Sequence, residues 1–206
     1  MKETLRPLFL TVPIAFGLWF FIFAVPAGNF WYKLVFSASI LAAIGLFCSR
    51  KVLPSLFACK ARHLLVGIVS ALLLYGVFWI GREVSVMLFP FASGQIEGVY
   101  TNKAQLGTAT IGLLLFFVMG PAEEIYWHGF VQRVLTGEVG PFKGVLFTTL
   151  IYTLIHAVSL NLMLVMAAFV CGVFWGLLYL REKSLVPLIV SHSLWDVLIF
   201  VFFPLG

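Results

Sequence analysis

Residues 106–135 read LGTATIGLLLFFVMGPAEEIYWHGFVQRVL, an almost uninterrupted apolar run that carries two glutamates near its middle. A helix needs about 20 apolar residues to cross the hydrocarbon core of a bilayer, at a rise of about 1.5 Å per residue. The run is therefore long enough to span a membrane as a helix. Charged side chains are costly inside hydrocarbon, so Glu123 and Glu124 need a specific reason to lie there.

More apolar runs flank this one, and each is long enough, or nearly so, to span a bilayer. They cover residues 8–25, 31–48, 64–81, 143–159, 162–180 and 185–203. The strict alternation of polar and apolar residues that is typical of membrane strands is absent, which favours a helical bundle over a barrel. The sequence therefore predicts an all-α, polytopic membrane helical bundle with about seven transmembrane helices.

The composition places the whole chain in the membrane class. Of its 206 residues, 62% are hydrophobic and only 10% are charged, and the mean hydropathy is +1.10. These few charged side chains cannot cover a soluble domain of this size, so lipid must cover it. Because no linker divides the chain, we expect a single integral membrane domain over 1–206. Residues 1–105 then hold three helices and an external loop, and 106–206 hold the four helices with chemical groups.

The 13 Lys and Arg residues stand in ones and twos beside the apolar runs, which is typical of membrane flanks and unlike a nucleic-acid-binding stripe. One side of the predicted bundle carries Lys2, Arg6, Arg50, Lys51, Lys60, Arg62, Arg133, Lys143, Arg181 and Lys183. The other side carries Lys33, Arg82 and Lys103. The positive-inside rule makes the N-terminus cytoplasmic. We expect a multi-pass protein of the cell membrane, inner or plasma, with residues 82–105 as its longest external loop.

Ionisable side chains recur inside three of the apolar runs, which is unusual for lipid-facing helices. Helix rise puts these groups about 11 to 20 Å from the cytoplasmic ends of their helices, in one slab of the membrane. They are Glu123, Glu124 and His128 in PAEEIYWHGF, His156 in LIYTLIHAV, and His192 and Asp196 in IVSHSLWDV. The sequence thus predicts that three helices bring their polar groups together.

Spacing within each helix gives every histidine a partner. Residues four apart lie on one helix face, which pairs Glu124 with His128, Tyr152 with His156, and His192 with Asp196. Adjacent Glu123 and Glu124 point about 100° apart on a helix. We therefore expect one glutamate to line a site and the other to support it through a hydrogen bond or a cation.

A carboxylate near imidazoles in a dry environment suits general-base activation of water. Ser191 and Ser159 are weaker candidates for a nucleophile, because Ser191 points to another helix face and Ser159 lies near a helix end. The zinc-protease pattern HExxH is absent, and we predict no cofactor or metal.

Three other interpretations remain open. The first is a metal site made by Glu123, His156, His192 and Asp196, which would suit zinc or iron. The second is a proton-coupled transporter, whose relays also use buried Glu, His and Asp. The third is a membrane scaffold without catalysis. His63, beside Arg62 at a helix start, is interpreted as a solvated flank residue, and the tryptophans as packing groups or interface anchors.

At these residues the chain resembles the CPBP family of membrane proteins, the CaaX protease and bacteriocin-processing (Abi-type) group, which includes the Ras-converting CaaX endopeptidases. The family pattern is a Glu-Glu pair followed by an arginine, then FxxxH, then HxxxN. Here it reads as Glu123-Glu124 with His128 at the arginine position, Tyr152-xxx-His156 and His192-xxx-Asp196. The resemblance covers residues 110 to 200 and leaves the first three helices unmatched.

The resemblance implies an intramembrane glutamic protease that cuts a membrane-associated peptide or protein tail. It implies that Glu123 activates the attacking water with His156, and that His192 and residue 196 stabilise the oxyanion. An ionised Asp196 cannot donate a hydrogen bond as asparagine would, so it either orients His192 or stays protonated. His128 removes the permanent cation near Glu124. We expect cleavage near the cytoplasmic half of the bilayer.

Overall fold

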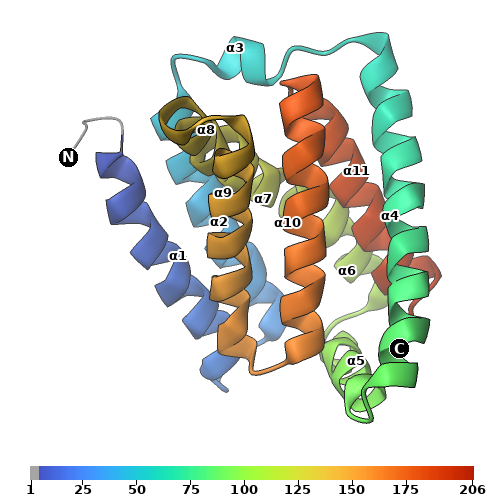
Figure 1. Ribbon diagram of the computed structural model, residues 1–206. Coiled ribbons are helices and arrows are strands. Elements are labelled where there is room, and N and C mark those ends of the chain that lie inside the picture. Colours follow the sequence, from blue (N-terminus) through green and yellow to red (C-terminus); the bar gives the residue numbers. More distant parts are fainter. Residues whose placement is uncertain (1–4) are drawn as a thin grey trace.

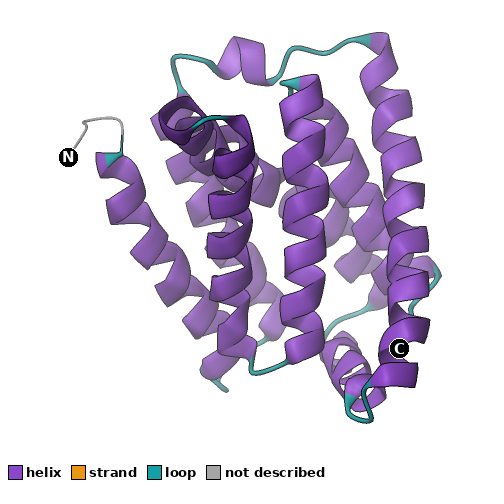
Figure 2. Cartoon of the chain, viewed as in Figure 1, coloured by secondary structure: helices purple, strands orange, loops and turns teal. Residues whose placement is uncertain are grey.

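The computed structural model describes residues 5–206, in which every regular element is a helix (Figure 2). The first half contains α1 Arg6–Ala24, α2 Phe30–Ser49, α3 Leu53–Leu56, α4 Ala61–Leu88, α5 Ala92–Tyr100 and the 3-10 helix η1 Thr101–Gln105. The second half contains α6 Thr108–Leu114, α7 Gly120–Tyr126, α8 Arg133–Val139, α9 Pro141–His156, α10 Leu162–Glu182 and α11 Val186–Val197. The predicted all-α class is confirmed.

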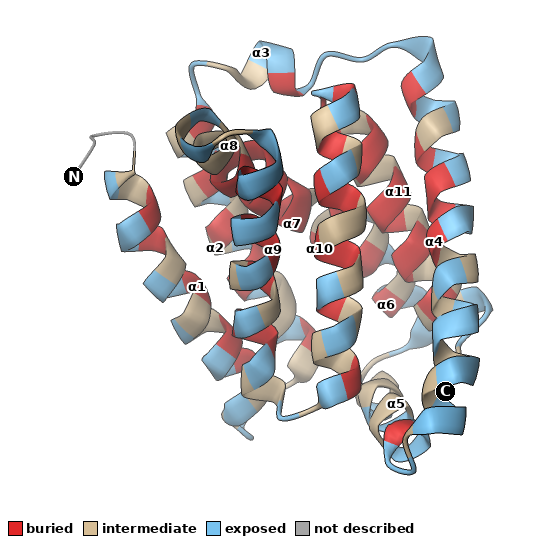
Figure 3. Cartoon of the chain, in the orientation of Figure 1, coloured by how far each residue is buried: buried red, intermediate tan, exposed pale blue. Residues whose placement is uncertain are grey.

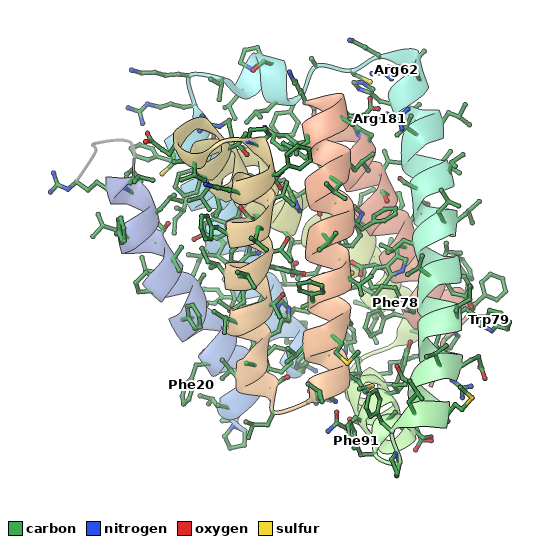
Figure 4. The ribbon with its side chains drawn as sticks, viewed as in Figure 1. Phe20, Arg62, Phe78, Trp79, Phe91 and Arg181 are labelled. Carbon is green, nitrogen blue, oxygen red and sulfur yellow. The ribbon has the colours of Figure 1, made fainter. Side chains whose placement is uncertain are left out.

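Six helical stretches are long and apolar enough to cross a membrane. They are Arg6–Ala24, Phe30–Ser49, Ala61–Leu88, Thr108–Val139, Pro141–Ser159 and Leu162–Glu182. A seventh, Val186–Phe202, is apolar but shorter. The chain is thus a multi-pass membrane protein, and about seven spans agree with the prediction. The large apolar side chains that face outward, such as Phe20 and Trp79, are placed to contact lipid (Figures 3 and 4).

The segment predicted as a long external loop is largely helical. α4 continues to Leu88, beyond the predicted end of its run at residue 81, and α5 with η1 then covers residues 92–105. This extension includes Arg82 and Glu83, whose side chains pair with each other at 2.6 Å. The helix ends at Leu88 because Pro90 disfavours the helical conformation at Phe89, which is extended.

The basic residues gather at one end of the bundle, beside α3 and α8 at the top of Figure 1, while α5 and the C-terminus lie at the other. Helix ends place Arg6, Arg50, Lys51, Lys60, Arg62, Arg133, Lys143, Arg181 and Lys183 at that basic end. Lys33, Arg82 and Lys103 lie toward the opposite end. Lys2 is outside the described residues. Figure 4 labels Arg62 and Arg181 together at the basic end. The charges are therefore segregated as the sequence predicts.

The fourth span is a composite helix at the centre of the bundle. In it α7 is flanked by two wider, π-helical segments, η2 Leu115–Met119 and η3 Trp127–Gln132. Such segments are frequent at functional sites. Gly120 begins α7, and a methyl group placed on it would come within 2.8 Å of the backbone nitrogen of Ser193 in α11. This close approach of two backbones places the Glu123-Glu124 turn beside the turn that carries His192.

Candidate active site

Glu124 lies between two imidazoles at the centre of the bundle. Its Oε1 is 2.7 Å from Nδ1 of His192, and its Oε2 is 2.6 Å from Nδ1 of His128. An ionised carboxylate only accepts, so Nδ1 of His192 donates to Glu124. The His128 ring is close but not aligned for a hydrogen bond, and both of its nitrogens lack a partner by that geometry within residues 5–206. Glu124 is only 1% exposed, so protein groups and not water must balance its charge.

His192 is held on two further sides. Its ring stacks on Trp175 with the centroids 3.8 Å apart and the planes 22° from parallel. The indole N–H of Trp175 donates to Oγ of Ser191, which fixes the tryptophan in turn. Nε2 of His192 lies 3.7 Å from Oδ2 of Asp196, too far for a hydrogen bond but close enough for charge interaction. The imidazole is thus fixed in position, while Nε2 makes no hydrogen bond within the described chain.

Glu123 points to a different place from Glu124. The hydroxyl of Tyr152 donates to Oε2 of Glu123 over 2.7 Å. Within residues 5–206, Oε1 has no hydrogen-bond partner, and it is not among the fully enclosed unsatisfied atoms. One oxygen of Glu123 is therefore oriented by the protein, and the other is free to bind a small molecule such as water.

His156 uses both ring nitrogens in contacts within the protein. Nδ1 lies 2.7 Å from the carbonyl oxygen of Tyr152, and Nε2 accepts a hydrogen bond of 3.2 Å from the indole N–H of Trp19. A carbonyl can only accept, so Nδ1 carries the proton and the ring is neutral. Tyr152 lies between Glu123 and His156 and contacts both. The two groups are therefore connected through Tyr152.

Most of the predicted site residues line one cavity of about 500 Å³. Glu123, Tyr152, His156, His192 and Asp196 all line it, together with many aromatic side chains. Glu124 and His128 lie behind this layer, where they contact His192 or each other. The sequence reasoning anticipated this division between a lining and a supporting glutamate. The roles of these residues in a reaction stay predictions.

Two tryptophans of the site were missed by the sequence reasoning, which interpreted them as packing groups or interface anchors. Trp19 comes from α1, a helix without any motif, and donates to His156. Trp175 comes from α10 and stacks on His192. No sequence signal distinguishes them from the other tryptophans, because their partners lie on other helices. His156 is 137 positions from Trp19, and His192 is on the helix after that of Trp175.

His63 corrects another expectation. It was interpreted as a solvated flank residue, but it is 1% exposed and lies 3.7 Å from a carboxylate oxygen of Glu182. Arg62 makes a 2.8 Å ion pair with the same oxygen. The start of α4 packs against the buried carboxylate of Glu182 at the end of α10, so His63 is covered by protein. Cys48, Cys59 and Cys171 are all free thiols.

The structure also bears on the two candidate serines and on the interpretation of the site as a metal centre. Ser191 accepts from Trp175, and Ser159 donates to the carbonyl of His156, so each hydroxyl already has a partner. In the part of the chain that the structure describes, no three His, Cys, Asp or Glu side chains are arranged to hold a metal ion.

Residues 105–198 match the family model described as Rce1-like, type II CAAX prenyl endopeptidase Rce1-like. No curated protein and no solved structure matches the chain. The matched segment contains the Glu123-Glu124 pair, His156, His192 and Asp196, whereas Trp19 lies outside it. The resemblance drawn from three short motifs is thereby confirmed for residues 105–198.

Proposed function

We propose that this chain is an intramembrane endopeptidase that hydrolyses a peptide bond in a membrane-associated peptide or protein tail, with water activated by Glu123. The family model that residues 105–198 match, a model of prenyl endopeptidases, supports the reaction class. One observation carries the mechanism. Glu123 lines a cavity with one carboxylate oxygen oriented by Tyr152 and the other without a protein partner in residues 5–206.

In the proposed reaction a water held at Oε1 of Glu123 gives a proton to the carboxylate and attacks the carbonyl carbon of the substrate. The proton then moves from Glu123 to the leaving amine as the C–N bond breaks. Tyr152 keeps its hydrogen bond to Oε2 and so fixes the direction of the free oxygen. His156 holds the backbone of Tyr152 in place through its carbonyl.

His192 is proposed to stabilise the oxyanion that forms on the substrate carbonyl. Its Nδ1–H is committed to Glu124, so it can donate from Nε2 only as an imidazolium. The carboxylate of Glu124 balances this cation, and Asp196 lies 3.7 Å from Nε2 on the other side of the ring. A preorganised donor of this kind is worth about 10²- to 10³-fold in rate. Asp196 therefore acts here through His192, and Glu124 supports the ring from behind.

Comparison of protein termini tests this proposal and requires no identified substrate. Membranes are isolated from cells that carry the wild-type chain and from cells that carry Glu123→Gln. We expect some membrane proteins to keep an uncut tail only with the variant. Identical sets of termini with wild-type chain, variant and no chain would refute the endopeptidase proposal.

Tyr152→Phe should lower the rate of peptide hydrolysis by about 10- to 100-fold, because the variant loses one charge-assisted hydrogen bond to Glu123, worth about 1.5 to 3 kcal/mol. Tyr126→Phe is the matched control. Tyr126 is also buried, but its hydroxyl bonds to Thr11, away from the cavity. The measurement is kcat with a cleavable membrane peptide. Equal losses in both variants would assign the effect to packing and not to the orientation of Glu123.

A further inference from the structure

A second hollow lies between α1 and α2 at the basic end of the bundle, apart from the cavity that contains the candidate site. This α1–α2 groove has a volume of about 620 Å³. The first half of α1 and the last turns of α2 form its walls, with side chains that include Arg6, Leu10, Ile14, Ala43, Phe47 and Cys48. Within residues 5–206, no residue lines both this groove and the larger cavity. The candidate active site therefore does not account for the groove.

The groove opens because α1 leans away from the rest of the bundle toward its N-terminal end (Figure 1). The other end of α1 is held in place, since Nζ of Lys33 donates to the carbonyl oxygen of Ile22 and the indole of Trp19 bonds to α9. Closer to the basic end, the hydroxyl of Tyr126 donates to Thr11. Within residues 5–206, no hydrogen bond joins α1 to another helix before Thr11. The two helices are therefore free to separate where the groove lies.

The walls of the groove are apolar and open to the membrane. α2 turns another face to the bundle, where a methyl group placed on Gly45 would lie 3.0 Å from the backbone oxygen of Ile125 in α7. Ala43 and Phe47 stand four residues apart and so share a face that does not pack on α7. Phe47 is 67% exposed, and Leu10 on the facing wall is 62% exposed. Hydrocarbon is the partner that suits such walls.

Two arginines stand where the groove meets the basic end. Arg6 is part of its lining, and the guanidinium of Arg50 lies over the ring of Phe47, 4.6 Å from the ring centroid. Arg50 donates from Nη1 to the carbonyl of Phe47, which leaves its other N–H groups for a ligand. Within residues 5–206, neither arginine pairs with an Asp or Glu side chain. The apolar groove thus ends at two cations that lack a protein anion in the described chain.

The length of the groove matches one leaflet of a bilayer. Along α1 it runs from Arg6 to Ile14, about 12 Å at the rise of a helix. Half of the hydrocarbon core of a membrane is about 15 Å thick. A hydrocarbon chain that begins at the arginines would therefore follow the groove and end near the middle of the membrane.

We propose that the α1–α2 groove binds one anionic phospholipid, with an acyl chain along the groove and the phosphate held by Arg6 and Arg50. Guanidinium groups match the geometry of phosphate oxygens and form charge-assisted hydrogen bonds with them. A zwitterionic headgroup would place a cation beside the two arginines, so a headgroup with net negative charge binds better. The positive-inside rule assigns this lipid to the cytoplasmic leaflet. The site is independent of the proposed endopeptidase function.

Native mass spectrometry of the full chain, released from detergent micelles, measures how tightly the first added lipid binds. We expect phosphatidylglycerol to bind at least about five times more tightly than phosphatidylcholine. Arg6→Gln and Arg50→Gln should each weaken the binding of phosphatidylglycerol about fivefold, because each removes one cation from the headgroup. Arg181→Gln is the matched control. It removes the same charge from the same end of the bundle, but from α10, and should leave the affinity unchanged.

A second pair of variants tests the acyl chain. Ala43→Trp fills the groove and leaves both arginines in place. It should weaken phosphatidylglycerol by more than about tenfold, since displacing even two methylene groups from an apolar site has an effect of that size. Leu46→Trp is the control, because Leu46 is exposed on α2 but does not line the groove. Glycerol phosphate, which carries the phosphate without acyl chains, should not displace the lipid.

Several results would overturn the proposal. Equal losses of affinity in Arg181→Gln and Arg6→Gln would show a diffuse attraction to the basic end and no defined site. Unchanged binding by Ala43→Trp would place the lipid outside the groove, and equal affinities for the two lipids would remove the role of net headgroup charge. Displacement by glycerol phosphate would identify a site for free phosphate esters. None of these measurements depends on peptide hydrolysis, so the lipid site and the endopeptidase proposal can fail separately.

Discussion

Glu123→Gln should reduce the rate of peptide hydrolysis by about 10²- to 10⁴-fold, the range of general-base catalysis. The amide has nearly the shape of the carboxylate, but its nitrogen cannot take a proton from water. Tyr152 can still donate to the amide oxygen, so the side chain should keep its place in the cavity. The measurement is the single-turnover rate with a membrane peptide, together with the melting temperature of the purified protein.

Glu83→Gln is the control for the loss of a carboxylate. Glu83 is exposed, pairs with Arg82 and does not line the cavity, so its replacement should leave the rate unchanged. A Glu123→Gln protein that retains more than about a tenth of the wild-type rate would remove Glu123 from the role of general base. If the chain were a scaffold, both variants would bind partners alike and no cleavage would be measured in either. If it were a proton-coupled transporter, Glu123→Gln would stop flux and not proteolysis.

The sequence could predict what helical geometry determines locally. The pairs Glu124 with His128 and His192 with Asp196 are neighbours because residues four apart share a helix face. The depth of each group also follows from helix rise, which is why convergence of three helices could be expected before their packing was known. Membrane class follows from composition alone, since lipid must cover a surface that charged residues cannot.

Contacts between helices could not be predicted in this way, because they depend on how each helix is rotated and how closely it packs. Glu124 contacts His192 only because Gly120 lets α7 meet the backbone of α11 at Ser193. The hydrogen bond from Trp19 to His156 likewise depends on where α1 packs. His63 was misplaced for the same reason, since the buried Glu182 that covers it belongs to another helix.

Glu124→Gln should act first on the fold and through it on the rate. Glu124 accepts a hydrogen bond from His192 with one oxygen and lies 2.6 Å from His128 with the other, and a neutral amide can keep that hydrogen bond but not the negative charge. Removing one partner of a buried ion pair lowers the free energy of unfolding by about 3 to 5 kcal/mol. We therefore expect a clear drop in melting temperature. We also expect a lower kcat per folded molecule, because the imidazolium proposed to stabilise the oxyanion loses the carboxylate that balances it.

Glu182→Gln separates these two effects. Glu182 is another buried carboxylate with a cationic partner, but it pairs with Arg62 at the basic end, away from the cavity. Its loss should lower the melting temperature in a comparable way and leave kcat per folded molecule unchanged. Equal kcat values for the two variants would show that Glu124 only stabilises the protein. A smaller kcat for Glu124→Gln alone would support its function as the positioning residue of His192, and His192→Gln should then add little further loss.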